Sequence, residues 1–170
     1  MSTLILINES CVNQKVDVIV NAANRYLAAG GGVCGAIFSK AGMTELTNAC
    51  NKYSIPLNDG EAVITPAFGI TNAKAIIHAV GPDFSVTPTA FSELFDAYYN
   101  SLLVVMENGY ESIAFPLISS GIFGGSLEDP VSESTKQCQI LPRAITTDNP
   151  QRKTSYSFLQ YVLHIPCNST

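Results

Sequence analysis

Short, β-branched apolar segments alternate with helical patterns along this chain, and this alternation limits the folds that it can adopt. Residues 3–8 (TLILIN) and 16–21 (VDVIVN) are compact apolar runs bounded by polar residues. Such runs are typical of strands that are buried on both faces of a sheet. Further strands are predicted at residues 61–66, 74–80, 112–118 and 156–165. Pro116 indicates an edge or irregular position near the end of the fifth of these six strands.

Helices are predicted between the strands. The clearest is residues 88–107, where apolar residues recur at three- and four-residue intervals and form one stripe. The stripe consists of Phe91, Leu94, Phe95, Tyr98, Leu102, Leu103 and Met106. The other predicted helices are residues 33–41, 44–52 and 129–139. Strands alternating with helices indicate an α/β fold of three layers, α/β/α, with a mixed central sheet covered on both faces.

The chain has 170 residues, without an internal repeat or a composition shift, so we expect one domain over residues 1–170. Its C-terminal part fits the pattern less well. Residues 139–155 (QILPRAITTDNPQRKTS) lack clean periodicity, and no helix follows the last predicted strand. We therefore expect a divergent, frame-shifted or incomplete C-terminal part.

Composition favours a soluble, cytoplasmic protein. The chain is 46% hydrophobic and 14% charged, and its net charge of −5 opposes attraction to a nucleic-acid backbone. The apolar stretch at residues 4–7 is too short for a membrane anchor, so no membrane partner is expected. The five cysteines are widely spread and form no C-x-x-C pair: Cys11, Cys34, Cys50, Cys138 and Cys167. We expect free thiols, no metal site and no cofactor.

Two glycine-rich stretches carry the functional signal. Gly30, Gly31 and Gly32 directly precede a predicted helix, whose first amides are unpaired and favour an anion. Residues 119–125 (SSGIFGG) follow the strand at 112–118. Loops at the carboxyl ends of strands can close on one ligand from two sides. Neither stretch contains lysine or arginine, so we expect a diphosphate held by main-chain amides and hydroxyls.

The same residues are compatible with other interpretations. Both stretches can be simple tight turns. Residues 30–35 satisfy G-x-G-x-x-G, but eight residues separate Asn21 from Gly30 and no acid follows near residues 50–55, so a Rossmann site is disfavoured. Of Asn21 and Asn24 we expect one to be structural, and we expect His78 to be a core histidine. The serines at 119 and 120 stand in no G-x-S-x-G elbow.

Four segments resemble the successive blocks of the macro domain family. They are VDVIVNAANRYLAAGGGVCGAIFSKAG, GEAVITPAF, AIIHAVGP and SIAFPLISSGIFGG, and the resemblance covers residues 3–138 in the right order and spacing. It implies a macro domain fold and an ADP-ribose ligand. Substrates implied by the family are ADP-ribosylated proteins and O-acetyl-ADP-ribose.

The resemblance also implies site residues. Asn24 would contact the distal ribose and position the attacking water, as the catalytic residue. Glu9 stands near the position of the family's adenine-binding aspartate. Cys34 occupies the position where many hydrolytic members have aspartate, and we expect it to be a small packing residue. The implied ligand-binding set is Glu9, Asn24, Gly31, Gly32, Val33, Ser119, Ser120, Gly121, Ile122, Phe123 and Gly124.

Two functions therefore remain open at the level of sequence. The first is hydrolysis of ADP-ribose esters, on protein or in O-acetyl-ADP-ribose, by water attack at the distal ribose; Asn24 and the intact glycine loop favour it, and it is the function that we expect. The second is recognition of ADP-ribose without chemistry, which Cys34 and the unusual C-terminal part favour. A reader of nucleic acid or poly(ADP-ribose) is disfavoured by the acidic charge.

Overall fold

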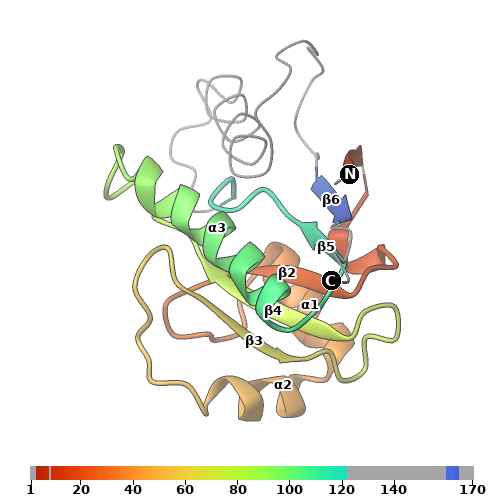
Figure 1. Cartoon of the computed structure of the whole chain (residues 1–170). Coiled ribbons are helices and arrows are strands. Elements are labelled where there is room, and N and C mark those ends of the chain that lie inside the picture. Colours follow the sequence, from red (N-terminus) through yellow and green to blue (C-terminus); the bar gives the residue numbers. More distant parts are fainter. Residues whose placement is uncertain (1–2, 8, 122–159, 165–170) are drawn as a thin grey trace.

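A six-stranded mixed sheet forms the centre of the molecule (Figure 1). The structure is a computed structural model that describes residues 3–7, 9–121 and 160–164. Its strands are β1 (Thr3–Ile7), β2 (Val18–Ala23), β3 (Ala62–Pro66), β4 (Ala75–Val80), β5 (Ser112–Phe115) and β6 (Gln160–His164). Its helices are η1 (Cys11–Asn13), α1 (Gly32–Ala41), α2 (Met43–Cys50) and α3 (Phe91–Glu107).

The strand order is β1-β6-β5-β2-β4-β3, and the directions of the strands decide where the loops meet. Strand β2 is parallel to β4 and to β5. Strand β6 is antiparallel to both β5 and β1. Strands β1, β5, β2 and β4 therefore run in the same direction, so their carboxyl ends lie at one edge of the sheet.

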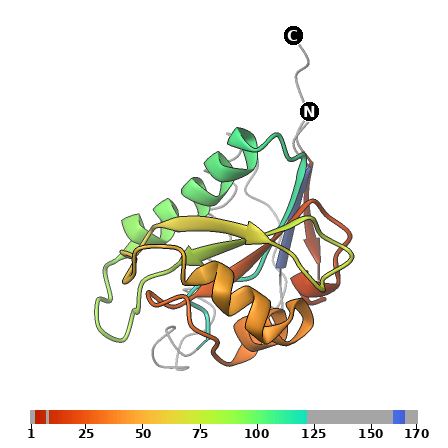
Figure 2. The same cartoon turned by 90° about the horizontal axis from the view of Figure 1, so that it is seen from below.

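Helices cover both faces of the sheet, as the alternation of elements predicts. Ile19 of β2 packs in a cluster with Phe38 of α1 and Leu46 of α2. Its neighbour Val18 points to the opposite face and packs in a cluster with Leu94 of α3. Figure 2 shows α3 on one side of the sheet and α1 and α2 on the other. The predicted three-layer α/β/α architecture with a mixed sheet is confirmed.

Two details of the strands differ from prediction. Strand β5 ends at Phe115, because Pro116 has no N–H to continue the ladder, and it lies inside the sheet between β6 and β2. The side chain of Ile5 is 43% exposed, because β1 is a terminal strand of the sheet. The expectation that β1 is buried on both faces is therefore wrong at Ile5. The helix predicted at residues 129–139 and the divergence expected beyond it lie outside the described residues.

Helix α3 begins at Phe91, three residues later than the sequence pattern indicates. The buried face contains Leu94, Tyr98 and Leu102 of the predicted stripe, whereas Met106 is 54% exposed. Small residues complete the buried face in its place: Ala97, Ser101 and Val105. A stripe defined only by large apolar residues misses such positions, where a small side chain lets the helix approach the sheet closely.

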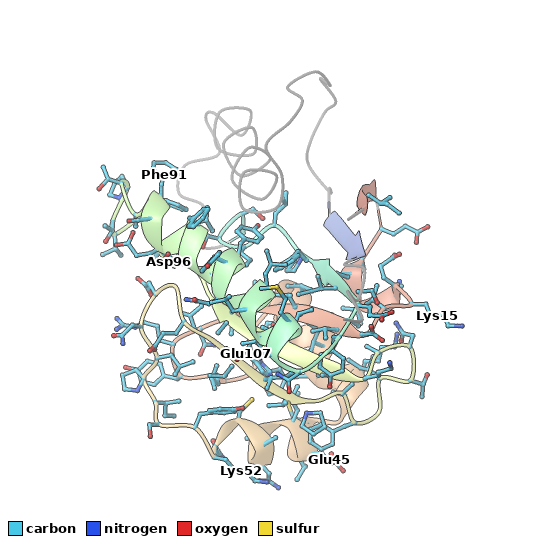
Figure 3. All side chains as sticks on the ribbon, in the orientation of Figure 1. Lys15, Glu45, Lys52, Phe91, Asp96 and Glu107 are labelled. Atoms are coloured by element: carbon cyan, nitrogen blue, oxygen red, sulfur yellow. The ribbon has the colours of Figure 1, made fainter. Side chains whose placement is uncertain are left out.

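Charged side chains lie at the periphery of the molecule, as Figure 3 shows for Lys15, Glu45 and Lys52. Among the residues described, Cys11, Cys34 and Cys50 are buried, and Cys34 and Cys50 are free thiols, as expected for these two. In the same part of the chain no group of three or more His, Cys, Asp or Glu residues is arranged to hold a metal ion. None of the described helices is both long enough and apolar enough to span a bilayer.

Candidate functional site

Two loops leave neighbouring parallel strands at the same edge of the sheet. The first follows β2 and leads through residues 24–31 into α1, and the second follows β5 through residues 116–121. Their strands pair directly, with Val18 opposite Ile113. A Cβ added at Gly81, just after β4, would collide with the side chains of Ile118 and Ser119. The second loop therefore lies against the end of β4, and both predicted loops leave the same edge of the sheet.

The glycines of the first loop fall into two kinds. Gly32 begins α1 with φ of +59°, a conformation that favours glycine, whereas Gly31 is extended with φ of −86°. A Cβ added at Gly31 or Gly32 would meet no atom of the described residues within 4 Å, and the same holds for Gly121 in the second loop. A Cβ at Gly35 would lie 2.6 Å from the carbonyl oxygen of Gly30. Gly35 is therefore closely packed, whereas Gly31, Gly32 and Gly121 border space that the described residues leave open.

The first turn of α1 can attract an anion. Its N-cap residue, Gly31, makes no side-chain cap hydrogen bond, and its first turn contains no acidic residue. The amides of a first helical turn lack partners within the helix and carry partial positive charge. Val33 follows in this turn and is half-buried, packed against the core cluster of α1. The space that the described residues leave open beside the glycines is thus flanked by amides that have no partner within the helix.

Asn24 stands at the end of β2 and organises the first loop. Its Oδ1 accepts hydrogen bonds from the amides of Tyr26 and Ala28, each at 3.1 Å. Its Nδ2 donates to the carbonyl oxygen of Ala28 at 2.8 Å. The second hydrogen on Nδ2 has no acceptor among the described residues. Asn24 therefore keeps one donor for a ligand while its other polar groups hold the loop.

Cys34 lies below this loop and is 6% exposed. Its Sγ donates to the carbonyl oxygen of Ala28 at 3.7 Å. A Cβ added at Gly30 would lie 3.8 Å from the same sulfur atom. The thiol packs under the main chain of the loop, which agrees with its interpretation as a small packing residue.

Asn21 and His78 form a buried pair within the sheet and do not belong to the loops. Asn21 Nδ2 lies 3.1 Å from His78 Nδ1, and Thr65 Oγ1 lies 3.0 Å from His78 Nε2. Burial lowers the pKa of His78 to about 4. His78 is therefore a neutral core histidine, as expected, and Asn21 is the structural member of the two asparagines.

The second loop is described as far as Gly121. Ser119 adopts φ of +62°, unusual for a residue with a side chain, and is 6% exposed. Its Oγ has no hydrogen-bond partner among the described residues. Ser120 is exposed, and its Oγ donates to the carbonyl oxygen of Leu117 at 2.8 Å. The predicted ligand-binding residues Ile122, Phe123 and Gly124 lie outside the described residues.

Glu9 is exposed just beyond the carboxyl end of β1. Its Oε2 accepts from Gln14 Nε2 at 3.3 Å, within the same connection between β1 and β2. Because β1 and β5 run in the same direction, Glu9 lies at the sheet edge that carries both loops. Strand β6 separates β1 from β5 in the sheet.

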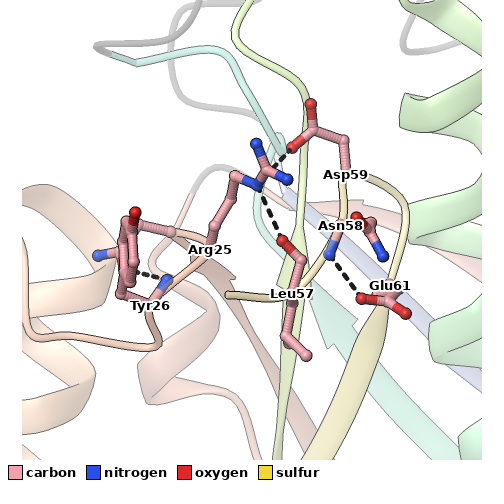
Figure 4. A network of polar contacts seen from close by, with 7 residues as sticks. Arg25, Tyr26, Leu57, Asn58, Asp59 and Glu61 are labelled. Carbon is pink, nitrogen blue, oxygen red and sulfur yellow. Dashed lines mark hydrogen bonds and ion pairs between the residues drawn. The ribbon is translucent and has the colours of Figure 1, made fainter. Parts of the chain in front are cut away.

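Sequence reasoning missed Arg25, the residue next to Asn24. Figure 4 shows its side chain reaching toward Leu57 and Asp59. Arg25 Nε donates to the carbonyl oxygen of Leu57 at 2.8 Å and lies 3.9 Å from Asp59 Oδ1. No spacing rule connects residues 32 positions apart in irregular segments, so the sequence offered no signal for this contact.

Fold and loops together define an α/β protein that presents glycine-rich main chain at the carboxyl edge of a mixed sheet. The family model of the Macro domain matches residues 20–133. The chain belongs to the macro domain family.

Relatives and solved structures agree with this assignment. An uncharacterised protein of Fusobacterium nucleatum is 43% identical over 150 residues, which are 88% of this chain and 80% of that protein. An O-acetyl-ADP-ribose deacetylase of Citrobacter koseri is 52% identical over 113 residues. That match covers 64% of this chain and 63% of the deacetylase, less than two thirds of its length. The Oceanobacillus iheyensis macrodomain, solved with ADP, has a TM-score of 0.71 at 31% identity and covers 85% of this chain and 80% of its own.

Proposed function

We propose that this protein binds ADP-ribose between the two loops and hydrolyses ADP-ribose esters. The observation that carries the proposal is the space that the described residues leave open beside Gly31, Gly32 and Gly121, at the carboxyl edge of neighbouring parallel strands. Amides of the first helical turn would face the diphosphate there, without help from a lysine or arginine in either glycine stretch. The name of the Citrobacter relative and the ADP in the Oceanobacillus structure support this ligand class.

In the proposed reaction, water is added across the ester bond at the distal ribose. The ester C–O bond breaks, the acyl group leaves as a carboxylic acid, and the ribose hydroxyl of ADP-ribose is regenerated. Asn24 would use its remaining N–H to orient the ribose or the attacking water, since its other polar groups are engaged with Tyr26 and Ala28. The substrates would be O-acetyl-ADP-ribose or proteins that carry an ADP-ribosyl ester.

The test combines a binding titration with a turnover assay on the same protein. We expect calorimetry with ADP-ribose to show micromolar binding, about −8 kcal/mol. We expect Asn24→Ala to lower turnover of O-acetyl-ADP-ribose by at least about tenfold and to weaken ADP-ribose binding less, because the residue acts mainly through orientation. Absence of ADP-ribose binding in the unmodified protein would exclude the proposed function as a whole.

A second candidate function is recognition of ADP-ribose without hydrolysis. Cys34 favours it, because a buried thiol hydrogen-bonded to Ala28 provides no carboxylate to activate water. The variant Cys34→Asp separates the two functions. A gain in turnover with unchanged ADP-ribose affinity would show that the site lacks only a base, whereas binding without turnover in both proteins would identify a recognition module.

A further inference from the structure

Arg25 and Leu57 are joined by two hydrogen bonds. The amide of Leu57 donates to the carbonyl oxygen of Arg25 at 2.8 Å, and Arg25 Nε donates to the carbonyl oxygen of Leu57 at 2.8 Å. The guanidinium also approaches Asp59 Oδ1 at 3.9 Å, with the two side chains 52% and 34% exposed. Figure 4 shows the two side-chain contacts of Arg25, to Leu57 and to Asp59, between the segment after β2 and the segment before β3.

The segment at residues 57–61 is itself fixed to the body of the protein. The amide of Gly60 donates to the carbonyl oxygen of Val80 at 2.8 Å, at the end of β4. Asn100 Nδ2 of α3 donates to the carbonyl oxygen of Gly60 at 2.8 Å. A Cβ at Gly60 would lie 2.9 Å from the Cβ of Asp96, so the segment also packs closely on α3. Arg25 thus attaches the first loop to a support held by two secondary-structure elements.

We propose that Arg25 is a positioning residue for Asn24, and that the hydrogen bond from its Nε to Leu57 performs this role. Arg25 directly follows Asn24, whose amide group depends on the main chain of Tyr26 and Ala28 for its orientation. Holding Arg25 therefore holds the loop that orients the remaining Asn24 N–H toward the distal ribose. This inference rests on the proposed function.

The geometry assigns the effect to the hydrogen bond and not to the charge. The bond to Leu57 is short and has a neutral acceptor, whereas the ion pair with Asp59 is long and about half-exposed. Pairs of exposed charges at such distances contribute little, because water and salt screen them.

Three substitutions separate the donor from the charge. Arg25→Gln keeps an N–H at the same number of bonds from Cα and removes the charge. Arg25→Lys keeps the charge and places a methylene group at that position, and Arg25→Met removes both. We expect Lys and Met to lower kcat for O-acetyl-ADP-ribose by about fivefold with KM within about twofold, the effect of one lost hydrogen bond. Arg25→Gln and the control Asp59→Asn should keep kcat within about twofold of the unmodified protein.

Amide hydrogen exchange in the ligand-free protein provides a readout that does not depend on activity. The amides of Tyr26 and Ala28 should exchange faster in the Lys and Met variants and at the original rate in Arg25→Gln. The proposal would be overturned if all Arg25 variants had the exchange rates and the kcat of the unmodified protein. It would also be overturned if Arg25→Gln exchanged faster and had a lower kcat while Arg25→Lys matched the unmodified protein. If the unmodified protein neither binds nor hydrolyses, the proposed function fails, and the exchange rates still decide whether Arg25 holds the loop. If Arg25→Met does not fold, the exchange rates and kcat of Arg25→Gln and Arg25→Lys still test whether the hydrogen bond positions Asn24.

Discussion

At the level of a single residue, a substitution of Gly31 tests the proposed position of the ligand. Its extended backbone, with φ of −86° and ψ of −178°, suits any amino acid, and an added Cβ would meet no atom of the described residues within 4 Å. We expect Gly31→Val to fold normally and to bind ADP-ribose at least about tenfold more weakly, because the isopropyl group would occupy the space that the diphosphate enters. Calorimetry and a thermal melt of the same sample measure both quantities.

Gly35 provides the matched control, because it differs from Gly31 in its surroundings and not in its chemistry. A Cβ at Gly35 would lie 2.6 Å from the carbonyl oxygen of Gly30, so the main chain must shift. We expect Gly35→Ala to lower the free energy of unfolding by about 1–3 kcal/mol. If Gly31→Val binds as tightly as the unmodified protein, the diphosphate does not lie beside Gly31.

At the level of elements, local patterns predicted the helices and strands well and their ends less well. Strand β2 continues through Ala22 and Ala23, two residues beyond the prediction, because pairing with β4 extends to Val80. Alanine carries little strand preference of its own, so only the neighbouring strand reveals this extension. The loop positions after β2 and β5 could be predicted, since glycine content and strand direction determine them. The contact of Arg25 with Leu57 could not, because it joins two irregular segments.

The burial of His78 in β4 predicts how the stability of the protein depends on pH. Burial lowers the pKa of His78 from 6.5 to about 4. Between these values the unfolded chain binds a proton that the folded protein excludes, so stability is greatest above pH 6.5 and falls as the pH decreases toward 4. We expect this histidine to lower the free energy of unfolding by about 2 kcal/mol between about pH 7 and about pH 5.

Urea denaturation at the two pH values measures this loss in the unmodified protein and in His78→Gln. The variant should be less stable at neutral pH, where it lacks the native contacts with Asn21 and Thr65. Its stability should nevertheless change less between the two pH values. An equal loss in both proteins would assign the acid sensitivity to other groups.

At the level of the whole molecule, the negative net charge of the protein repels the negatively charged diphosphate of the proposed ligand. The chain carries −5, and its glycine stretches contain no lysine or arginine. If main-chain amides hold the diphosphate, salt has few attractive charge pairs to screen and weakens the overall repulsion instead. We expect ADP-ribose affinity to be unchanged or up to about threefold higher at about 500 mM than at about 50 mM NaCl, by calorimetry. A strong loss of affinity at high salt would point to a cationic side chain in the site.

The close contact between Gly81 and Ser119 limits how this scaffold can be redesigned. Any side chain at position 81 would displace Ile118 and Ser119 before it touched a bound molecule. Residue 81 is therefore unsuitable for engineering new specificity. Within the connection between β2 and α1, Gly31 and Gly32 are also poor choices, because Gly31 borders the proposed diphosphate space and the φ of +59° at Gly32 favours glycine. Variation in the size of an accepted acyl group is better sought at the other residues of that connection.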